Sequence, residues 1–225
     1  MNDIPVLDSL DARSEILDRI RSANRALFGT ARDQAPEQSW SAIPRAYRQD
    51  SSLTDAGRVQ LLTERLLEYG AGVYRCQPAE VASNIADILL SRLKENILLS
   101  SDVDPHWLPD GPTYVFDNGL SFSEIESFDG VLTGCTVAIA MTGTLAICHT
   151  STGSRRALTL LPDYHLCVVD AASIVETVAE GFRALEPHRT EPITLISGPS
   201  ATADIEMTRI QGVHGPRVLD CLIVV

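Results

Sequence analysis

The chain has 225 residues, 44% of them hydrophobic, and it carries 30 acidic against 18 basic residues. A formal net charge of −12 opposes the approach of nucleic acid and anionic lipid, so we exclude both as partners. No run approaches the ~20 apolar residues of a membrane span, and the acidic N-terminus lacks a signal-type apolar block, so we expect a cytosolic protein.

The five cysteines do not have the spacing of a metal or cluster site. An iron–sulfur cluster needs closely spaced thiolates, and no two of these cysteines form a C-x-x-C pair. We therefore expect reduced thiols, most of them acting as small core side chains. The sequence predicts no metal and no cofactor on this chain.

Residues 11–27 carry apolar side chains at helical spacing, which predicts an amphipathic helix. Residues 29–52 show no such period and contain prolines and scattered polar residues, which indicates a surface arm. The large side chains of Trp40, Ile43 and Tyr47 favour packing of this arm on its own domain; a second subunit, and hence a homo-oligomer, is the alternative. We divide the chain into 1–52, the N-terminal helix and arm, and 53–225, an α/β domain.

Helix and strand patterns alternate from Thr54 onward. Thr54 is a good N-cap for a helix that ends at Gly70, and residues 72–76 read as a strand. Pro78 begins a second helix with a clear 3.6-residue period, and residues 97–99 form the next strand. This alternation predicts a mostly parallel, open α/β sheet with helices on both faces.

Two β-type runs, residues 131–140 and 145–148, flank a tight turn. The turn contains Thr142, Gly143 and Thr144, and it predicts a hairpin or a bulge. A functional interpretation is that the Thr142 hydroxyl and the amides of Gly143 and Thr144 face a ligand, because small residues let the backbone approach closely. The structural and functional interpretations both stay open.

A polar loop and the strand after it supply further candidate ligand residues. Of the paired arginines in the loop, we favour Arg156, because a guanidinium grips a carboxylate or phosphate at two points; a solvated surface position is the alternative. Asp163 and His165 lie two residues apart at a strand start and would point to one face. They are close enough to share a proton, but two ligands do not make a metal site.

Residues 173–186 read as a helix. Ser173 and Glu176 fit a capping box, and Pro187 follows the last turn. We expect this helix to connect two parallel strands in a right-handed βαβ unit. That unit would bring the Asp163 region beside the C-terminal loop.

Residues 193–225 read as strand, tight turn, helix, loop and final strand. The turn at 197–200 would place the N-terminus of a helix over 203–210 beyond the carboxyl end of a strand, where anions collect. The candidate ligand residues here are Ser197, Gly198, Ser200, Thr202, His214 and Arg217. Either Asp204 or Glu206, together with His214, is the candidate catalytic acid–base pair; the alternative is that the acids only favour a helix start and that His214 and Arg217 are solvated.

The sequence ISGPSATADIE followed by GVHGPR resembles the C-terminal signature of the LUD-domain family, in its lactate-utilization protein C branch. Two further segments, 138–145 and 155–169, resemble the same family. The match is dense over 132–225. It implies a fold similar to the sugar-phosphate isomerase and coenzyme A transferase (NagB/RpiA/CoA transferase-like) superfamily, an α/β sheet with helices on both faces.

The resemblance also implies a function. The branch belongs to a bacterial three-protein system that oxidises L-lactate to pyruvate, and its two companions are iron–sulfur proteins. This chain would be the clusterless component, binding a small carboxylate or phosphate ligand or the two partners. The alternative is a free-standing enzyme or sensor of the same superfamily that acts on a phosphorylated or acyl substrate.

Met141 departs from the family pattern. Family members commonly carry an acidic residue at this position, before Thr-Gly-Thr. A thioether cannot act as a general acid or base, nor as an acyl-accepting carboxylate. This departure puts in doubt a coenzyme A transferase-like mechanism at Met141.

Overall fold

The computed structural model describes residues 9–28, 40–44, 46–149, 155–202, 210–211 and 215–225. The chain forms two units, Met1–Tyr47 and Arg48–Val225. In the first unit, α1 (Ser9–Phe28) confirms the predicted amphipathic helix. None of the helices in the described ranges has the length and hydropathy of a membrane-spanning segment.

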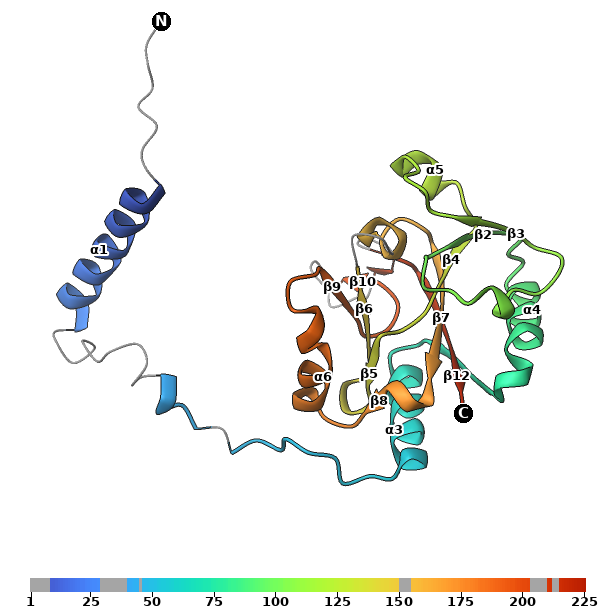
Figure 1. Ribbon diagram of the computed structural model, residues 1–225, viewed down its shortest axis with the longest axis horizontal. Coiled ribbons are helices and arrows are strands. Elements are labelled where there is room, and N and C mark those ends of the chain that lie inside the picture. The colour runs from blue at the N-terminus through green and yellow to red at the C-terminus, as the bar shows by residue number, and fades with distance from the viewer. Residues whose placement is uncertain (1–8, 29–39, 45, 150–154, 203–209, 212–214) are drawn as a thin grey trace, which may run out of the picture. The chain divides into compact units, whose positions relative to one another are not determined.

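Six parallel strands form the main sheet of the second unit (Figure 1). Their order across the sheet is β1 (Gly72–Cys76), β12 (Val218–Val224), β7 (Tyr164–Asp170), β4 (Gly130–Thr133), β2 (Asn96–Leu99) and β3 (Thr113–Phe116). The two longest strands, β7 and β12, are neighbours near the middle and almost entirely buried. The predicted mostly parallel sheet is confirmed.

Each face of the main sheet has its own core. Alternate residues of β7 and β12 point to opposite faces, so Val168 and Leu222 pack with α4 (Val81–Ser91). On the other face, Cys167 and Cys221 pack with α3 (Asp55–Glu68). Helices therefore cover both faces, as the sequence predicts. A short helix, α5 (Phe122–Glu126), packs beside β2 and β4.

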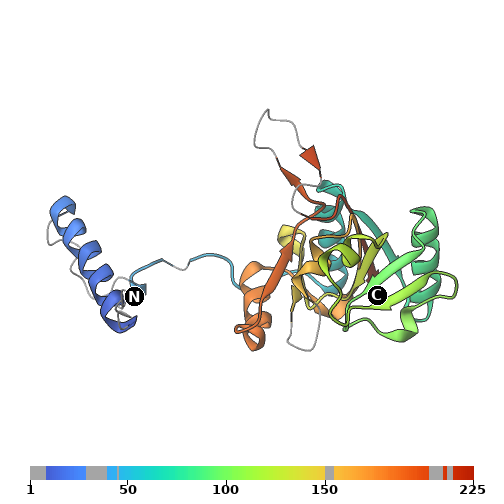
Figure 2. The same ribbon diagram turned by 90° about the horizontal axis from the view of Figure 1, so that it is seen from above.

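A second sheet of four strands packs on the α3 side of the main sheet. Its order is β8 (Ile174–Val175), β5 (Val137–Ile139), β6 (Thr144–Cys148) and β9 (Ile193–Ile196). The β5–β6 pair is the predicted hairpin. The run predicted as one strand over 131–140 is in fact two strands, β4 in the main sheet and β5 in the second. Figure 2 shows α6 (Val178–Leu185) at the side of this second sheet.

The βαβ unit predicted after β7 forms within the second sheet rather than between β7 and the next strand. The strand that follows α6 is β9, which pairs antiparallel with β6 rather than parallel with β7. The chain leaves the main sheet at Asp170, makes a 3-10 turn over Ala171–Ser173 and joins the second sheet as β8 before α6 begins. The helix therefore connects two strands of the second sheet, β8 and β9. These strands run parallel, as predicted, because β8 is parallel to β5 and both β5 and β9 are antiparallel to β6.

The predicted capping box is also displaced by one turn. Thr177 is the N-cap of α6, and Glu180 is its reciprocal partner. Both the predicted and the observed pair obey the same four-residue pattern, so local sequence does not separate them. Glu176 instead is buried and accepts hydrogen bonds from the amides of Ser52 and Leu53, at 2.6 and 2.8 Å. It thereby fixes the chain just before α3.

The helix predicted over 203–210 does not include Ile210, which lies in a strand. Residues Ala201–Thr202 (β10) and Ile210–Gln211 (β11) pair as antiparallel strands. Thr202 and Ile210 are β-branched, which favours extended pairing over a helix. Residues 203–209 lie outside the described part of the chain. The turn at 197–200 therefore leads directly into the strand β10.

Candidate functional site

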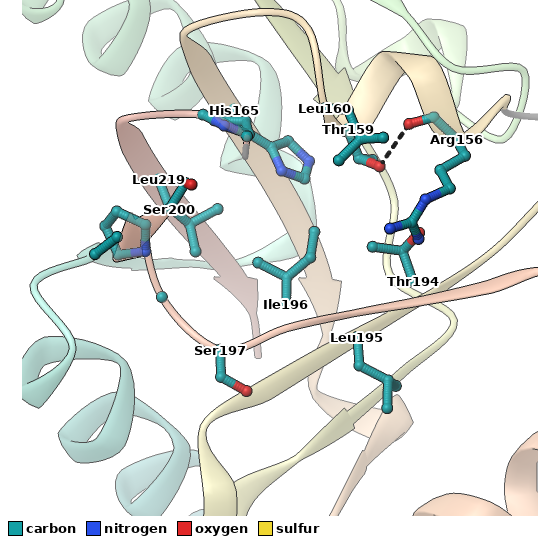
Figure 3. A pocket seen from close by; sticks show the side chains of 15 residues that line it. Arg156, Thr159, Leu160, His165, Thr194, Leu195, Ile196, Ser197, Ser200 and Leu219 are labelled. Atoms are coloured by element: carbon teal, nitrogen blue, oxygen red, sulfur yellow. Dashed lines mark hydrogen bonds between the residues drawn. The ribbon is translucent and has the colours of Figure 1, made fainter. Parts of the chain in front are cut away.

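A cavity of about 330 Å³ opens between the two sheets. The main sheet contributes the starts of β7 and β12, and the second sheet contributes β9 and the turn after it (Figure 3). The cavity thus follows the carboxyl end of β9, as the sequence predicts for its turn, but it lies at the amino ends of the two central parallel strands. Its polar side chains come from Arg156, Thr159, His165, Thr194, Ser197 and Ser200.

Arg156 supplies a positive charge to this cavity. It begins a 3-10 turn (Arg156–Thr159), and its guanidinium donates a hydrogen bond to Thr194 Oγ1 at 3.1 Å. Within the described residues, no carboxylate pairs with Arg156 and no aspartate or glutamate lines the cavity. The neighbouring Arg155 instead donates two hydrogen bonds to the Asp117 carboxylate, from Nε at 2.5 Å and from Nη2 at 2.6 Å. Of the two arginines, Arg156 is thus the one positioned for a ligand.

Thr194 connects Arg156 to a second polar group. Its hydroxyl, on the buried side of β9, also lies 2.6 Å from Nε2 of the buried His149. One hydroxyl between an imidazole and a guanidinium restricts both side chains. We expect this contact to hold the guanidinium toward the cavity.

His165 presents an unused nitrogen. The ring is completely buried, its Nε2 lies 2.8 Å from Thr133 Oγ1, and its Nδ1 has no hydrogen-bond partner in the described part of the chain. Burial lowers the pKa of His165 to about 4, so the ring is neutral at neutral pH and carries one N–H. Figure 3 shows the ring beside Leu160, with Ile196 below it.

The surroundings of Thr133 indicate which nitrogen carries that hydrogen. The Thr133 hydroxyl is buried, and the His165 ring is its hydrogen-bond partner. The hydroxyl donates its hydrogen only if Nε2 accepts it, since buried donors are nearly always paired. We therefore assign the proton to Nδ1, which leaves His165 neutral with a buried N–H that has no partner in the described part of the chain.

The turn Ser197–Ser200 contributes to the cavity, whereas the Thr-Gly-Thr turn does not. The hydroxyls of Thr142, Thr144 and Ser197 form a chain with two contacts of 2.8 Å. The Gly143 amide donates to Ala140 within its own turn. These groups fix the end of β9 to the β5–β6 hairpin, so the structural interpretation of this turn describes them better than the ligand-facing one.

Gly143 and Gly198 allow close packing against α3. Both have positive φ, at 58° and 88°. A Cβ at Gly143 would lie 2.8 Å from Arg65 Cβ, and one at Gly198 would lie 2.5 Å from Tyr69 Cβ. The backbone approach that these glycines permit is therefore to a helix rather than to a ligand.

Asp163 and Arg217 lie outside the cavity. They pair with each other at the surface, with contacts of 3.0 and 2.6 Å, and both side chains are more than half exposed. Asp163 therefore does not share a proton with His165. The Thr202 side chain and the residues Asp204, Glu206 and His214 lie outside the described part of the chain.

Local sequence patterns do not identify Thr133 and Thr194, the threonines that contact His165 and Arg156. Thr133 and Thr194 sit inside apolar β-type runs, where a single hydroxyl is easily taken for a solvent-facing position. A polar residue on the inward face of an alternating strand is the signal that was available. Their partners, His165 and Arg156, come from segments 32 and 38 residues away, which no local pattern reveals.

The protein is therefore an α/β protein in which two sheets pack together and a cavity opens between them. The model of the LUD domain matches residues 117–224. A Deinococcus radiodurans protein named lactate utilization protein C is 37% identical over 211 residues, covering 92% of this chain and 94% of that one. The chain belongs to the LUD-domain family, in its lactate-utilization protein C branch, which confirms the resemblance.

Two further comparisons agree with this assignment. A lactate utilization protein C from Shouchella clausii is 33% identical over 114 residues, 48% of this chain and 49% of that one. A crystal structure of a DUF162 family protein from Deinococcus radiodurans superposes with a TM-score of 0.66 at 34% identity. It covers 77% of this chain and 99% of the other, so most of the fold is shared.

Proposed function

We propose that this protein is the clusterless component of a bacterial system that oxidises L-lactate to pyruvate, and that its cavity binds the carboxylate of a small organic acid. The family branch, matched over nearly the whole chain, supports the role in lactate utilization. The observation that carries the ligand proposal is that one cavity is lined by Arg156, which pairs with no carboxylate among the described residues, and by His165, whose buried Nδ1 has no partner among them either.

The cavity suits such a ligand chemically. A guanidinium binds a carboxylate with two parallel hydrogen bonds, and the Nδ1–H of His165 can donate to a further oxygen. Ile196, Leu160 and Leu219 provide apolar surface for a short carbon chain. A few cationic and neutral donors in a cleft attract an anion locally even though the whole chain carries a net charge of −12.

The redox step would belong to two iron–sulfur partner proteins, with this chain holding the acid. The alternative, a free-standing enzyme acting on a phosphorylated or acyl substrate, depends on Asp204, Glu206 and His214. These residues lie outside the described part of the chain, so that alternative stays a prediction.

Growth on L-lactate tests the proposed role. In a strain that lacks the gene, we expect growth on L-lactate as sole carbon source to be lost while growth on glucose is retained. The wild-type gene and Arg217→Gln should restore growth, because Arg217 is paired outside the cavity. Arg156→Gln should not, because it removes the cationic group that Arg156 contributes to the cavity.

Affinity purification of the tagged wild-type protein from lactate-grown cells should also recover the two iron–sulfur proteins. Undiminished growth of the gene-deleted strain on L-lactate would refute the role in lactate utilization. Full restoration of growth by Arg156→Gln would refute only the importance of the cavity.

A further inference from the structure

Cys148, His188 and Glu191 come together on the α6 side of the second sheet. Cys148 ends β6, and the other two residues lie in the connection between α6 and β9. One ligand atom from each residue lies within 4.8 Å of the other two. Nδ1 of His188 is 2.7 Å from Oε2 of Glu191. Three different metal-binding groups thus converge from segments about 40 residues apart in the sequence.

This group is separate from the cavity between the sheets. Cys148 packs with Val137, Ala146 and Leu185, on the face of the second sheet that α6 covers. The next residue, His149, contacts Thr194 at the cavity instead. Successive residues of a strand face opposite sides, so the two groups lie on opposite faces of the same small sheet.

We propose that Cys148, His188 and Glu191 form a binding site for a divalent cation of the zinc type. Thiolate sulfur, imidazole nitrogen and carboxylate oxygen are the three protein donors of zinc, at bond lengths of about 2.0–2.3 Å. A tetrahedral ion at those lengths holds its ligand atoms about 3–4 Å apart. The side chains of His188 and Glu191 are 34% and 31% exposed, so they have room to rotate on their turn. An ion would replace their 2.7 Å contact, moving these two ligand atoms slightly apart and bringing both into reach of an ion bound by Cys148.

The donor set selects the cation. Calcium and magnesium prefer sites made of oxygen alone, whereas a set with one sulfur and one nitrogen favours zinc and similar transition metals. A thiolate and a carboxylate together neutralise the two charges of the ion. Three protein ligands leave one position for water, and the partial exposure of His188 and Glu191 gives that position access to solvent.

The exposed pair His106–Asp104 shows what the same contact looks like without the thiol. Its Nδ1–Oδ1 distance is 2.9 Å. Among the described residues, no cysteine lies close enough to form a group of three metal ligands with this pair. The local spacing of cysteine and histidine in the sequence predicts no metal on this chain. The convergence of Cys148 with the His188 turn is visible only in the folded chain and leads us to the opposite proposal.

Titration of the metal-free full-length protein with Co²⁺ tests this site. We expect one Co²⁺ per chain and a sulfur-to-cobalt charge-transfer absorption band, which Zn²⁺ abolishes by displacement. Cys148→Ser should remove the band. His188→Gln and Glu191→Gln should each weaken Zn²⁺ binding by about a hundredfold, because each removes a ligand. His106→Gln should change neither reading.

Circular dichroism checks that each variant is folded. His188 and Glu191 are partly exposed, so their variants test the site even if Cys148→Ser perturbs the sheet. Absence of stoichiometric Co²⁺ binding by the wild-type protein would overturn the proposal. So would a charge-transfer band that survives Cys148→Ser, or Zn²⁺ affinity that His188→Gln and Glu191→Gln leave unchanged.

Discussion

Replacing Arg92 with methionine should lower the free energy of unfolding by about 3–5 kcal/mol, because the change leaves a buried carboxylate without its cation. Asp220, the single charged residue of β12, is completely buried. It accepts hydrogen bonds from Arg92 Nε and Nη2 at 2.8 and 2.7 Å and from the Tyr164 hydroxyl at 2.9 Å. Methionine keeps the aliphatic stem but cannot compensate the charge.

Urea denaturation of both proteins measures this difference. Arg217→Met is the matched control. Arg217 donates two hydrogen bonds to the Asp163 carboxylate, as Arg92 does to Asp220, but this pair is exposed. We expect the control to shift the urea midpoint little, because solvent screens an exposed pair. Equal, small shifts for both variants would show that the Arg92–Asp220 pair does not stabilise the centre of the main sheet.

Acid should destabilise the protein through His165. The pKa of this ring is about 4 in the folded protein, lowered by burial from its ordinary value of 6.5. The unfolded chain therefore binds a proton at a higher pH than the folded one does. Stability from the neutral ring is complete above pH 6.5 and is lost as the pH falls toward 4, in total about 3 kcal/mol.

Comparison with His165→Gln isolates this contribution. Both proteins are unfolded with urea at pH 7 and at pH 4, without carboxylate buffers. The carboxylates titrate in both, so we expect the wild type to lose about 3 kcal/mol more stability between the two pH values than the variant does. An equal loss in the two proteins would mean that the folded protein does not oppose protonation of His165.

The sequence predicts the main sheet well because the signals there are local. Thr54 accepts from the Gly57 amide as the expected N-cap of α3, and the 3.6-residue period after Pro78 gives α4. The second sheet is harder to predict. The pairing of β9 with β6 depends on where the chain leaves the main sheet after Asp170, and hydrophobic periodicity does not encode that point.

The candidate site is predictable only in part, for the same reason. Arg156, His165 and the turn at 197–200 are found from residue type and position, and the fold brings them to one cavity. The Asp163–His165 pairing fails because Asp163 precedes β7 and meets Arg217 at the surface. The contributions of Thr133 and Thr194 depend on contacts across the sheets.

Calorimetric titration of pyruvate and of L-lactate into the purified protein tests the central claim most directly. We predict binding of one acid per chain, weakened about thirtyfold in Arg156→Gln by loss of the charged hydrogen bonds and unchanged in Arg217→Gln. The melting temperature of Arg156→Gln should match that of the wild type, because the side chain is exposed and pairs with no carboxylate of the described chain. No binding of either acid, or equal affinity in Arg156→Gln and wild type, would contradict the proposal that this cavity holds a small organic acid.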